Sequence, residues 1–271
     1  MKINGETKLI GFFGSTYKTS KMYAMYNAAF EALGLNYAYV PLVVKDLKKA
    51  VEGIRHLGIS AVGVTIPYKI ELIPFLDELD DNAKRIGAVN VVLNKEGKLI
   101  GGNTDGEGAV MALKEKTKIK GKKVILLGAG GAARAIAFAI KDAGGELIIL
   151  NRTVADAQVL AKAVGVKFGD LNKLESEIKS ADVLINSTSV GMFPKEDESL
   201  VSKELLHSSL IIQEVVSNPR ETKLLNDAKS IGCQTVFADK MLFWQGVLKF
   251  EMYTGIKPPI KIMEKALLNF K

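Results

Sequence analysis

The segment Val124-ILLGAGGAARA-Ile136 constrains the fold of this 271-residue chain more than any other. An apolar run leads directly into Gly128-Ala-Gly-Gly-Ala-Ala133, a G-x-G-x-x-A pattern that opens an alanine-rich helix. In such a unit the first glycine permits a tight turn, the second lets the backbone approach a pyrophosphate, and the last small residue lets helix and strand pack closely. The helix amino terminus offers free N–H groups to the anion. We therefore predict dinucleotide binding at Gly128, Ala129, Gly130, Gly131 and Ala132.

A second strand, Glu146 to Leu150, follows this helix and ends in Asn151-Arg152-Thr153. An NAD site usually has Asp or Glu here, about 20 residues past the glycines, where the carboxylate accepts hydrogen bonds from the ribose. Neutral Asn151 followed by Arg152 suits a 2′-phosphate instead. We therefore expect NADP as the cofactor and keep NAD as the alternative, in which Arg152 is an ordinary surface arginine.

Strand and helix signals alternate along nearly the whole chain, which is typical of an α/β protein with largely parallel sheets. Before the glycine turn we expect strands at 9–13, 37–40 and 61–65, helices at 22–33 and 45–57, and a hairpin at 90–102. In the second part we expect strands at 123–127, 146–150, 182–187, 210–216 and 234–237, and helices at about 240–254 and 260–270. The predicted division is a sheet domain over 1–105, a Rossmann domain over 106–238, and C-terminal helices over 239–271 that return to the first domain.

The positive charge is concentrated in one run. Of the formal net charge of +7, the segment 114–123 carries +5, from six lysines and one glutamate. No arginine or aromatic residue stands among these lysines. The run therefore lacks the side chains that bind phosphate through two hydrogen bonds or stack on bases. We interpret the run as a solvated connector at the entrance to the cofactor domain, and we expect small anionic partners rather than nucleic acid.

Other features point to a cytoplasmic protein. The single cysteine, Cys233, excludes an intrachain disulfide, and the opening MKINGETK lacks the apolar core of a signal peptide. The longest apolar runs are far shorter than the ~20 residues of a membrane span. We expect no membrane contact, and both a monomer and a homodimer stay open.

Few side chains can carry chemistry. His56 and His207 are interpreted as structural, and no spacing of His, Cys, Asp and Glu suggests a metal site. Lys69 follows the apolar strand of Gly63-VTIPY-Lys69, where desolvation can lower its pKa. Asp105 lies in a glycine-flanked loop just before the nucleotide domain. The alternatives are that Lys69 is one lysine of many and that Asp105 caps a helix.

Taken together, these segments resemble the shikimate dehydrogenase family, and within it the quinate/shikimate dehydrogenase-like branch. The resemblance runs in order over essentially the whole chain. It rests on Ser20 with Met25-YNAA-Phe30, Gly63-VTIPY-Lys69, Gly87-Ala-Val-Asn90, Gly102-NTDG, the glycine turn, Asn151-Arg-Thr153, Asn186-STSVG-Met192 and Met241-LFWQG.

The resemblance implies an NADP- or NAD-dependent oxidoreductase that interconverts 3-dehydroshikimate and shikimate, with quinate as a further candidate, in the biosynthesis of chorismate and the aromatic amino acids. Residues 1–105 would be the substrate-binding catalytic domain, with Lys69 and Asp105 as the catalytic pair. The positions that match substrate-binding ones are Ser20, Thr65, Asn90 and Gln245. Those that match cofactor-binding ones, beyond the glycine turn, are Asn151, Arg152, Thr153, Thr188, Val190 and Met192.

Several positions depart from the family pattern. The second serine and the proline of Ser-x-Ser-Pro are here Met22 and Tyr23, and the following histidine is Tyr26. The tyrosine of Tyr-x-Pro is Ser217, and a lysine after Asn-Arg-Thr is Asp156. Candidate replacements for the lost carboxylate contacts are Thr16, Thr19, Tyr23 and Tyr26.

Two other functions stay open. One is a dehydrogenase of the same scaffold with a shifted substrate, since each unreplaced hydrogen bond to the carboxylate costs ~1–3 kcal/mol. The other is a nucleotide-binding regulatory module without catalysis. Retention of both Lys69 and Asp105 argues against the second.

Overall fold

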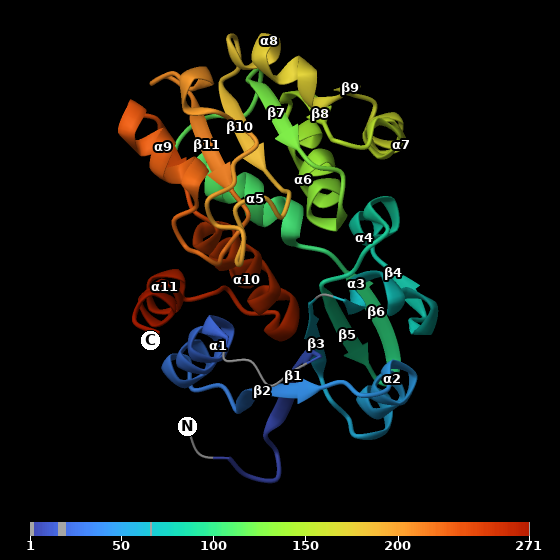
Figure 1. Ribbon diagram of the computed structural model, residues 1–271. Coiled ribbons are helices and arrows are strands. Elements are labelled where there is room, and N and C mark those ends of the chain that lie inside the picture. Colours follow the sequence, from blue (N-terminus) through green and yellow to red (C-terminus); the bar gives the residue numbers. More distant parts are fainter. Residues whose placement is uncertain (1–2, 16–19, 66, 271) are drawn as a thin grey trace. The chain divides into compact units, whose positions relative to one another are not determined.

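The computed structural model describes residues 3–15, 20–65 and 67–270. The chain divides into two compact units (Figure 1). Unit 1 comprises Met1–Thr104 and Gly246–Lys271, and unit 2 comprises Asp105–Gln245. Unit 1 is therefore built from two separate stretches of sequence. Helix α10 (Ala238–Thr254) contains the second division point.

Unit 1 contains a six-stranded mixed sheet in the order β2-β1-β3-β5-β6-β4. Strands β1, β2 and β3 are parallel, whereas β5 is antiparallel to both β3 and β6. The strands are β1 (Lys8–Gly14), β2 (Tyr37–Val43), β3 (Ala61–Val64), β4 (Glu78–Leu79), β5 (Val91–Lys95) and β6 (Lys98–Gly102). The helices are α1 (Lys21–Ala32), α2 (Leu47–His56), α3 (Tyr68–Glu71), η1 (Ile73–Phe75), α4 (Asp81–Ile86) and α11 (Ile260–Leu268).

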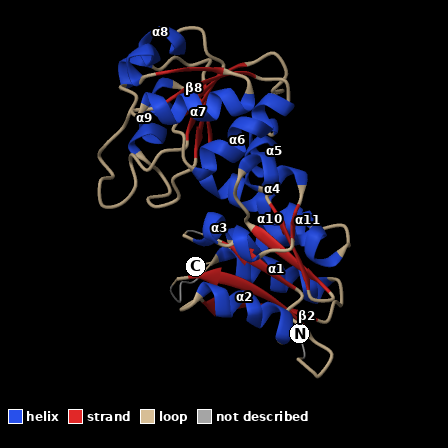
Figure 2. Ribbon diagram, turned by 90° about the vertical axis from the view of Figure 1, so that its right-hand side faces the viewer, coloured by secondary structure: helices blue, strands red, loops and turns tan. Residues whose placement is uncertain are grey.

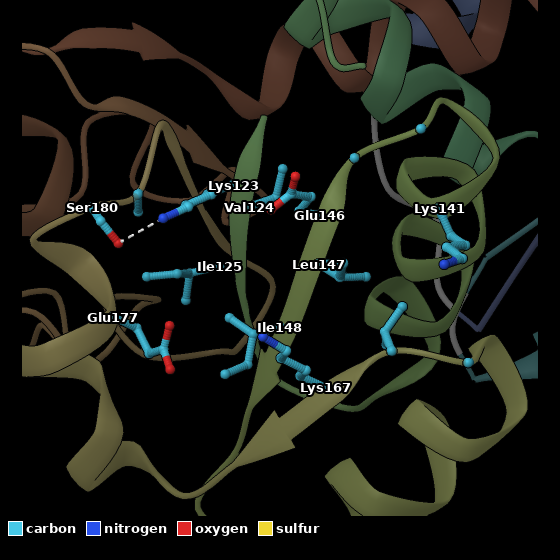
Figure 3. Close-up of a pocket in the computed structure, with 15 residues that line it drawn as sticks. Lys123, Val124, Ile125, Lys141, Glu146, Leu147, Ile148, Lys167, Glu177 and Ser180 are labelled. Carbon is cyan, nitrogen blue, oxygen red and sulfur yellow. Dashed lines mark hydrogen bonds between the residues drawn. The ribbon is translucent and has the colours of Figure 1, made fainter. Parts of the chain in front are cut away.

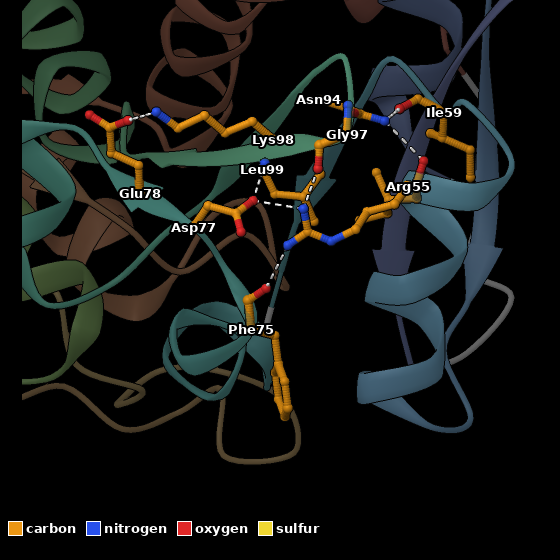
Figure 4. Close-up of polar contacts among 10 residues, drawn as sticks. Arg55, Ile59, Phe75, Asp77, Glu78, Asn94, Gly97, Lys98 and Leu99 are labelled. Carbon is orange, nitrogen blue, oxygen red and sulfur yellow. Dashed lines mark hydrogen bonds and ion pairs between the residues drawn. The ribbon is translucent and has the colours of Figure 1, made fainter.

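The predicted hairpin is formed by β5 and β6. Its two-residue turn has positive φ at both Glu96 (53°) and Gly97 (89°), the conformation whose twist matches the flanking strands. Arg55, at the end of α2, holds this turn in place, because its guanidinium donates to the Gly97 carbonyl, to Asp77 and to the Phe75 carbonyl (Figure 4). These bonds attach the turn to two other segments of unit 1.

Residues 246–271 belong to unit 1, whereas 239–245 of the predicted C-terminal segment belong to unit 2. Helix α11 packs against α1, although more than 200 residues separate them in sequence (Figure 1). The second half of α10 contributes Phe250, which stacks on Phe30 of α1 with 5.6 Å between ring centroids. The aromatic and apolar face of α1 is therefore covered by the end of the chain.

Unit 2 is an all-parallel, six-stranded sheet in the order β12-β11-β10-β7-β8-β9. Its strands are β7 (Lys123–Leu127), β8 (Glu146–Leu150), β9 (Lys167–Gly169), β10 (Val183–Asn186), β11 (Ile211–Glu214) and β12 (Gln234–Val236). Its other helices are α5 (Asp105–Lys114), α6 (Gly131–Asp142), α7 (Val154–Val164), η2 (Leu171–Lys173), α8 (Leu174–Ile178), η3 (Lys203–Leu205) and α9 (Lys223–Ile231). Counted from β7, the strand order is 3-2-1-4-5-6, which defines the Rossmann fold.

Helices flank the sheet of unit 2 (Figure 2). Alternate side chains of the central strands, among them Ile125 and Leu150, form one core with residues of α8 and α9. The remaining ones, such as Leu126 and Ile149, are equally buried. Strands buried on both faces read as continuous apolar runs, which is why the sequence signals them strongly. Strand β9 is not predicted, because it is three residues long, pairs on one side only and has no apolar run.

Glycines on α5 allow close packing of helices inside unit 2. A Cβ at Gly106 would lie 2.1 Å from the Ala135 carbonyl oxygen of α6, and one at Gly108 would lie 2.7 Å from the backbone nitrogen of Gln245 in α10. No side chain fits at either distance. Two candidate site residues, Asp105 and Gln245, are therefore fixed by helix contacts that only glycine permits.

We predict that Gly106→Ala lowers the thermal unfolding midpoint, because the added methyl group must push α5 away from the backbone of α6. The expected cost is ~1–3 kcal/mol, as for other overpacked sites. Gly53→Ala is the matched control, since Gly53 lies inside α2 with only a leucine methyl at 4.0 Å. That variant should gain ~0.5–1 kcal/mol. An unchanged midpoint for Gly106→Ala would contradict the close approach.

Candidate active site

The glycine turn follows β7 at the carboxyl edge of the sheet in unit 2. Gly128 has φ of +109°, and a Cβ there would lie 2.9 Å from the Ser187 hydroxyl oxygen. Gly130 is the N-cap of the twelve-residue helix α6 and makes no side-chain cap. A Cβ at Gly130 or Gly131 would meet no atom within 4 Å. Ala129 and Ala132 are half-buried beside them. An uncapped helix amino terminus facing open space fits a dinucleotide pyrophosphate.

The second cofactor segment follows the neighbouring strand β8. The Asn151 backbone N–H donates to the Gly169 carbonyl of β9, and its side-chain amide donates to the Thr153 carbonyl at 3.0 Å. This leaves Arg152 and Thr153 exposed at the start of α7. Within the described residues Arg152 takes part in no ion pair, so its guanidinium suits a phosphate. Asp156, in the first turn of the same helix, adds an opposing charge.

The third segment follows β10 and folds back on itself. The Thr188 hydroxyl donates to Asn186 Oδ1 at 2.7 Å and accepts from the Val190 backbone N–H at 3.2 Å. Met192 and the adjacent Phe193 expose 44% and 62% of their surfaces. Exposed apolar side chains at this edge of the sheet suit a flat, weakly polar ring such as nicotinamide.

Glu214, at the end of β11, is a residue that the sequence analysis missed. It has no exposed surface and accepts hydrogen bonds from Asn186, Thr222 and two backbone N–H groups. Burial raises the pKa of this carboxyl above its usual range, although the hydrogen bonds oppose that shift. The sequence signal for it is weak, because Gln213 separates this glutamate from the apolar run Leu210-Ile-Ile212.

In unit 1 the candidate residues lie around the carboxyl end of β3. Lys69 is half-buried on the short helix α3, and its backbone carbonyl accepts from the Val89 N–H at 2.8 Å. The half-buried Thr65 donates its backbone N–H to the Phe13 carbonyl. Asn90 is fully buried, and its carbonyl accepts from the Val64 N–H. Backbone hydrogen bonds therefore hold these three segments together.

Asn90 also fixes the end of unit 1. Its amide donates to the Thr104 hydroxyl at 3.1 Å, and its Oδ1 accepts from the Thr104 N–H at 3.1 Å. Asp105, the next residue, begins α5 and is 7% exposed. Gln245 is 5% exposed, and its amide donates to the Leu242 carbonyl one turn earlier in α10.

Ser20 is the N-cap of α1, where its hydroxyl oxygen accepts from the Met22 N–H at 3.3 Å. Met22 is 3% exposed, and its sulfur lies 3.2 Å from the Cβ position of Gly246. The Tyr26 hydroxyl donates to the Gly246 carbonyl at 3.1 Å. Tyr26 therefore does not replace a lost carboxylate contact. Thr16 and Thr19 lie outside the described residues.

Tyr26, Tyr39 and Tyr253 are packed together in unit 1. Their rings lie 4.5 to 6.3 Å apart, and burial raises the pKa of all three phenols, well above the usual range for Tyr26 and Tyr39. The hydroxyls of Tyr39 and Tyr253 lie 2.8 and 3.1 Å from the Cβ position of Gly63 in β3. These phenols therefore form the packed support behind β3. Tyr23 of α1 is half-buried against Phe12 and Tyr39.

Cys233 and His207 make hydrogen bonds within unit 2 and lie apart from the cofactor segments in the sequence. Cys233 is buried with its thiol on the His207 carbonyl, and burial raises the pKa of the thiol. The His207 ring contacts Ser209 and the Ile178 carbonyl.

Within the described residues no group of three His, Cys, Asp or Glu side chains could hold a metal ion. In the same residues no helix is long and apolar enough to cross a membrane.

The lysine run directly precedes β7 and ends at its first residue, Lys123, so it lies at the amino edge of the sheet in unit 2, opposite the glycine turn. Lys123 begins β7, whereas the glycine turn follows its end, about 16 Å away for five residues of strand. Lys123, Lys141 and Lys167 line a separate hollow of about 470 Å³ together with Glu146 and Glu177 (Figure 3). The ~16 Å between Lys123 and the glycine turn exceeds the screening length of ~8 Å in physiological salt.

The strand order of unit 2, its uncapped glycine turn and the polar segments after β8 and β10 define a dinucleotide-binding protein of the Rossmann class. Three family models match the chain: the shikimate dehydrogenase substrate binding domain at 12–92, shikimate / quinate 5-dehydrogenase at 110–229, and the shikimate 5'-dehydrogenase C-terminal domain at 240–268. The chain belongs to the shikimate dehydrogenase family, and the predicted family and fold class are confirmed.

Individual relatives agree with this placement. A shikimate dehydrogenase (NADP(+)) of Carboxydothermus hydrogenoformans is 43% identical over 98% of this chain and 99% of its own. A crystal structure of a shikimate dehydrogenase in complex with NADP+ is 41% identical, has a TM-score of 0.92, and is matched over 99% of this chain and 97% of its own. The ligand-free 5-ketofructose reductase of a Gluconobacter strain is 32% identical, with a TM-score of 0.87, over 98% and 99% of the chains.

We predict that Arg152→Ala raises the dissociation constant of NADP by about 10- to 100-fold, because charged hydrogen bonds to the 2′-phosphate are worth ~1.5–3 kcal/mol. NAD binding should change less than twofold. Fluorescence titration with both cofactors measures the difference. Lys162→Ala removes the same charge from the other end of α7 and is the matched control. Equal weakening of NADP and NAD would remove Arg152 from the phosphate site.

Proposed function

We propose that this protein is an NADP-dependent shikimate dehydrogenase that reversibly reduces 3-dehydroshikimate to shikimate in the biosynthesis of the aromatic amino acids. The observation that carries the proposal is the match over 98% of the chain to a relative named as a shikimate dehydrogenase (NADP(+)). Residues 1–105 and the helices of 239–271 serve the substrate, and residues 106–238 serve the cofactor. The cyclic hydroxy carboxylate is the small-molecule partner.

The chemistry that NADPH supplies when bound is hydride transfer to the carbonyl carbon. Lys69 stabilises the negative charge that develops on the carbonyl oxygen and transfers a proton to it. Asp105 is the other member of the catalytic pair, and its carboxylate accepts a hydrogen bond from a neighbouring substrate hydroxyl. Thr65, Asn90, Gln245 and Ser20 bind the substrate. The rigid support of Asn90 by Thr104 agrees with such a role, because site residues must be held close to one geometry.

The cofactor is held by backbone and side chains of unit 2. The amino end of α6 binds the pyrophosphate through Gly130 and Gly131, and Arg152 with Asn151 and Thr153 binds the 2′-phosphate. Thr188, Val190 and Met192 border the nicotinamide. The single thiol is buried, which agrees with a reducing cytoplasm as the compartment. The assembly is a monomer or a homodimer.

A second candidate is a dehydrogenase of this scaffold for a neutral polyhydroxy ketone. The observation that favours it lies in the first half of α1, where Met22 is buried and the Tyr26 hydroxyl donates to the Gly246 carbonyl, so neither side chain donates to a substrate carboxylate. Ser217 is exposed and offers a shorter side chain than the family's tyrosine. The similar 5-ketofructose reductase, by its name, acts on such a ketone.

Initial rates decide between these candidates. Shikimate, quinate and 5-ketofructose are assayed, the first two with NADP and NAD and the third with NADPH and NADH. We expect the highest kcat/KM for shikimate with NADP. A higher value for 5-ketofructose would establish the second candidate, and no turnover of any substrate, with NADP still bound, would leave a binding module.

We predict that Lys69→Ala lowers kcat by about 10²- to 10⁴-fold, the usual contribution of a positioned acid–base group. The dissociation constant of NADP should stay unchanged, because Lys69 belongs to unit 1 and the glycine turn to unit 2. Lys84→Ala is the control, since Lys84 is exposed and pairs with Asp81 at 3.7 Å. Survival of turnover in Lys69→Ala would refute the assigned mechanism.

A further inference from the structure

Glu214 is the centre of a hydrogen-bond network at the carboxyl edge of the sheet in unit 2. Its Oε1 accepts from the backbone N–H groups of Val215 and Val216 at 2.9 and 3.0 Å and from Asn186 Nδ2 at 3.0 Å. Its Oε2 accepts from Asn186 Nδ2 at 3.1 Å and from the Thr222 hydroxyl at 2.9 Å. Both oxygens of a fully buried carboxylate are thus surrounded by donors.

Asn186 extends this network into the segment that follows β10. Its Oδ1 accepts from the Thr188 backbone N–H at 3.1 Å and from the Thr188 hydroxyl at 2.7 Å, and its Nδ2 lies 3.3 Å from the Val190 carbonyl. The carboxylate fixes which way the Asn186 amide points, because only the NH₂ side can face Glu214. The oxygen then has to face Thr188.

Thr222 holds the far end of the same segment. It is 1% exposed, accepts from the Leu225 N–H as the N-cap of α9, and lies 3.5 Å from the Cβ position of Gly191. Gly191 has φ of +87°, a conformation that glycine adopts readily. Glu214 therefore contacts both residues that shape 186–192, one at each end.

Burying a carboxylate costs several kcal/mol, and apolar residues of similar volume often replace a buried charge without loss of stability. Packing alone does not call for a glutamate here. We propose that Glu214 is a positioning residue for the cofactor: without touching it, Glu214 sets the conformation of 186–192 and so the binding of the nicotinamide half of NADP. The inference rests on the proposed function, in which Thr188, Val190 and Met192 border that half.

Glu214→Gln tests this directly. It keeps the shape and removes the charge, and in either amide orientation the new NH₂ faces the NH₂ of Asn186. The Asn186 side chain must then turn or move. We expect the dissociation constant of NADP to rise about tenfold, as for the loss of charged hydrogen bonds. The dissociation constant of adenosine 2′,5′-bisphosphate, which probes only the phosphate and adenine end at Asn151 to Thr153, should change less than twofold.

Gln213→Leu is the matched control. Gln213 is the preceding residue of β11 and is equally buried, but its amide donates to the Ala109 carbonyl of α5. Loss of this bond perturbs the same strand on its other face, and we expect both ligands to bind as in the unchanged protein. If Glu214→Gln does not fold, Thr222→Val removes the donor to Oε2 and should show the same difference between NADP and the bisphosphate, at about threefold.

The possible failures are distinguishable. If the unchanged protein binds neither NADP nor the bisphosphate, the proposed function is wrong. If it binds both, and the variant weakens both equally or changes neither, Glu214 is not a positioning residue. A parallel loss of NADP affinity in Gln213→Leu would likewise overturn the inference, because the effect would then follow from any disturbance of β11.

Discussion

The sheet of unit 2 is buried on both faces, and this constraint decides where polar groups can stand. Strands β7, β8, β10 and β11 carry apolar side chains above and below the sheet, so a side chain that meets a ligand must lie at a strand end. Each of these four strands ends in, or is followed by, a glycine or a polar residue. Gly128 follows β7, Asn151 follows β8, Asn186 ends β10 and Glu214 ends β11. Gly128, Asn151 and Asn186 belong to segments of the candidate cofactor site, and Glu214 supports the last of these segments.

In unit 1, glycines make room for large side chains of neighbouring elements. Gly63 in β3 leaves room for the hydroxyls of Tyr39 and Tyr253, and Gly246 in α10 leaves room for Met22 and Met25. The missing side chains let the two tyrosines pack onto β3 and let α1 pack onto α10. The candidate substrate residues Thr65 and Ser20 lie directly after β3 and directly before α1.

The sequence predicted the elements whose residue pattern is compatible with one local structure. The glycine turn, the hairpin and the long apolar strands are of this kind, and all are found within a few residues of their expected bounds. It missed Glu214, because a glutamate inside the segment 210–216 gives no sign of which backbone groups surround it. It placed the lysine run before the cofactor domain but not at an edge of the sheet, since charge in a sequence does not tell at which edge it lies. Tyr26 was unpredictable for a similar reason, as its partner Gly246 is 220 residues away.

The discontinuity of unit 1 affects the order in which the chain can fold during synthesis. Residues 105–245 form one continuous stretch with its own core, so unit 2 can complete its contacts as soon as it leaves the ribosome. Helix α1 precedes unit 2 in the sequence, whereas the second half of α10 and helix α11, which pack against α1, follow unit 2. Met25 and Phe30 therefore stay uncovered until Gly246 and Phe250 of α10, about 220 residues later in the sequence, have been synthesised. Unit 1 therefore begins to be synthesised before unit 2 but completes its contacts after it.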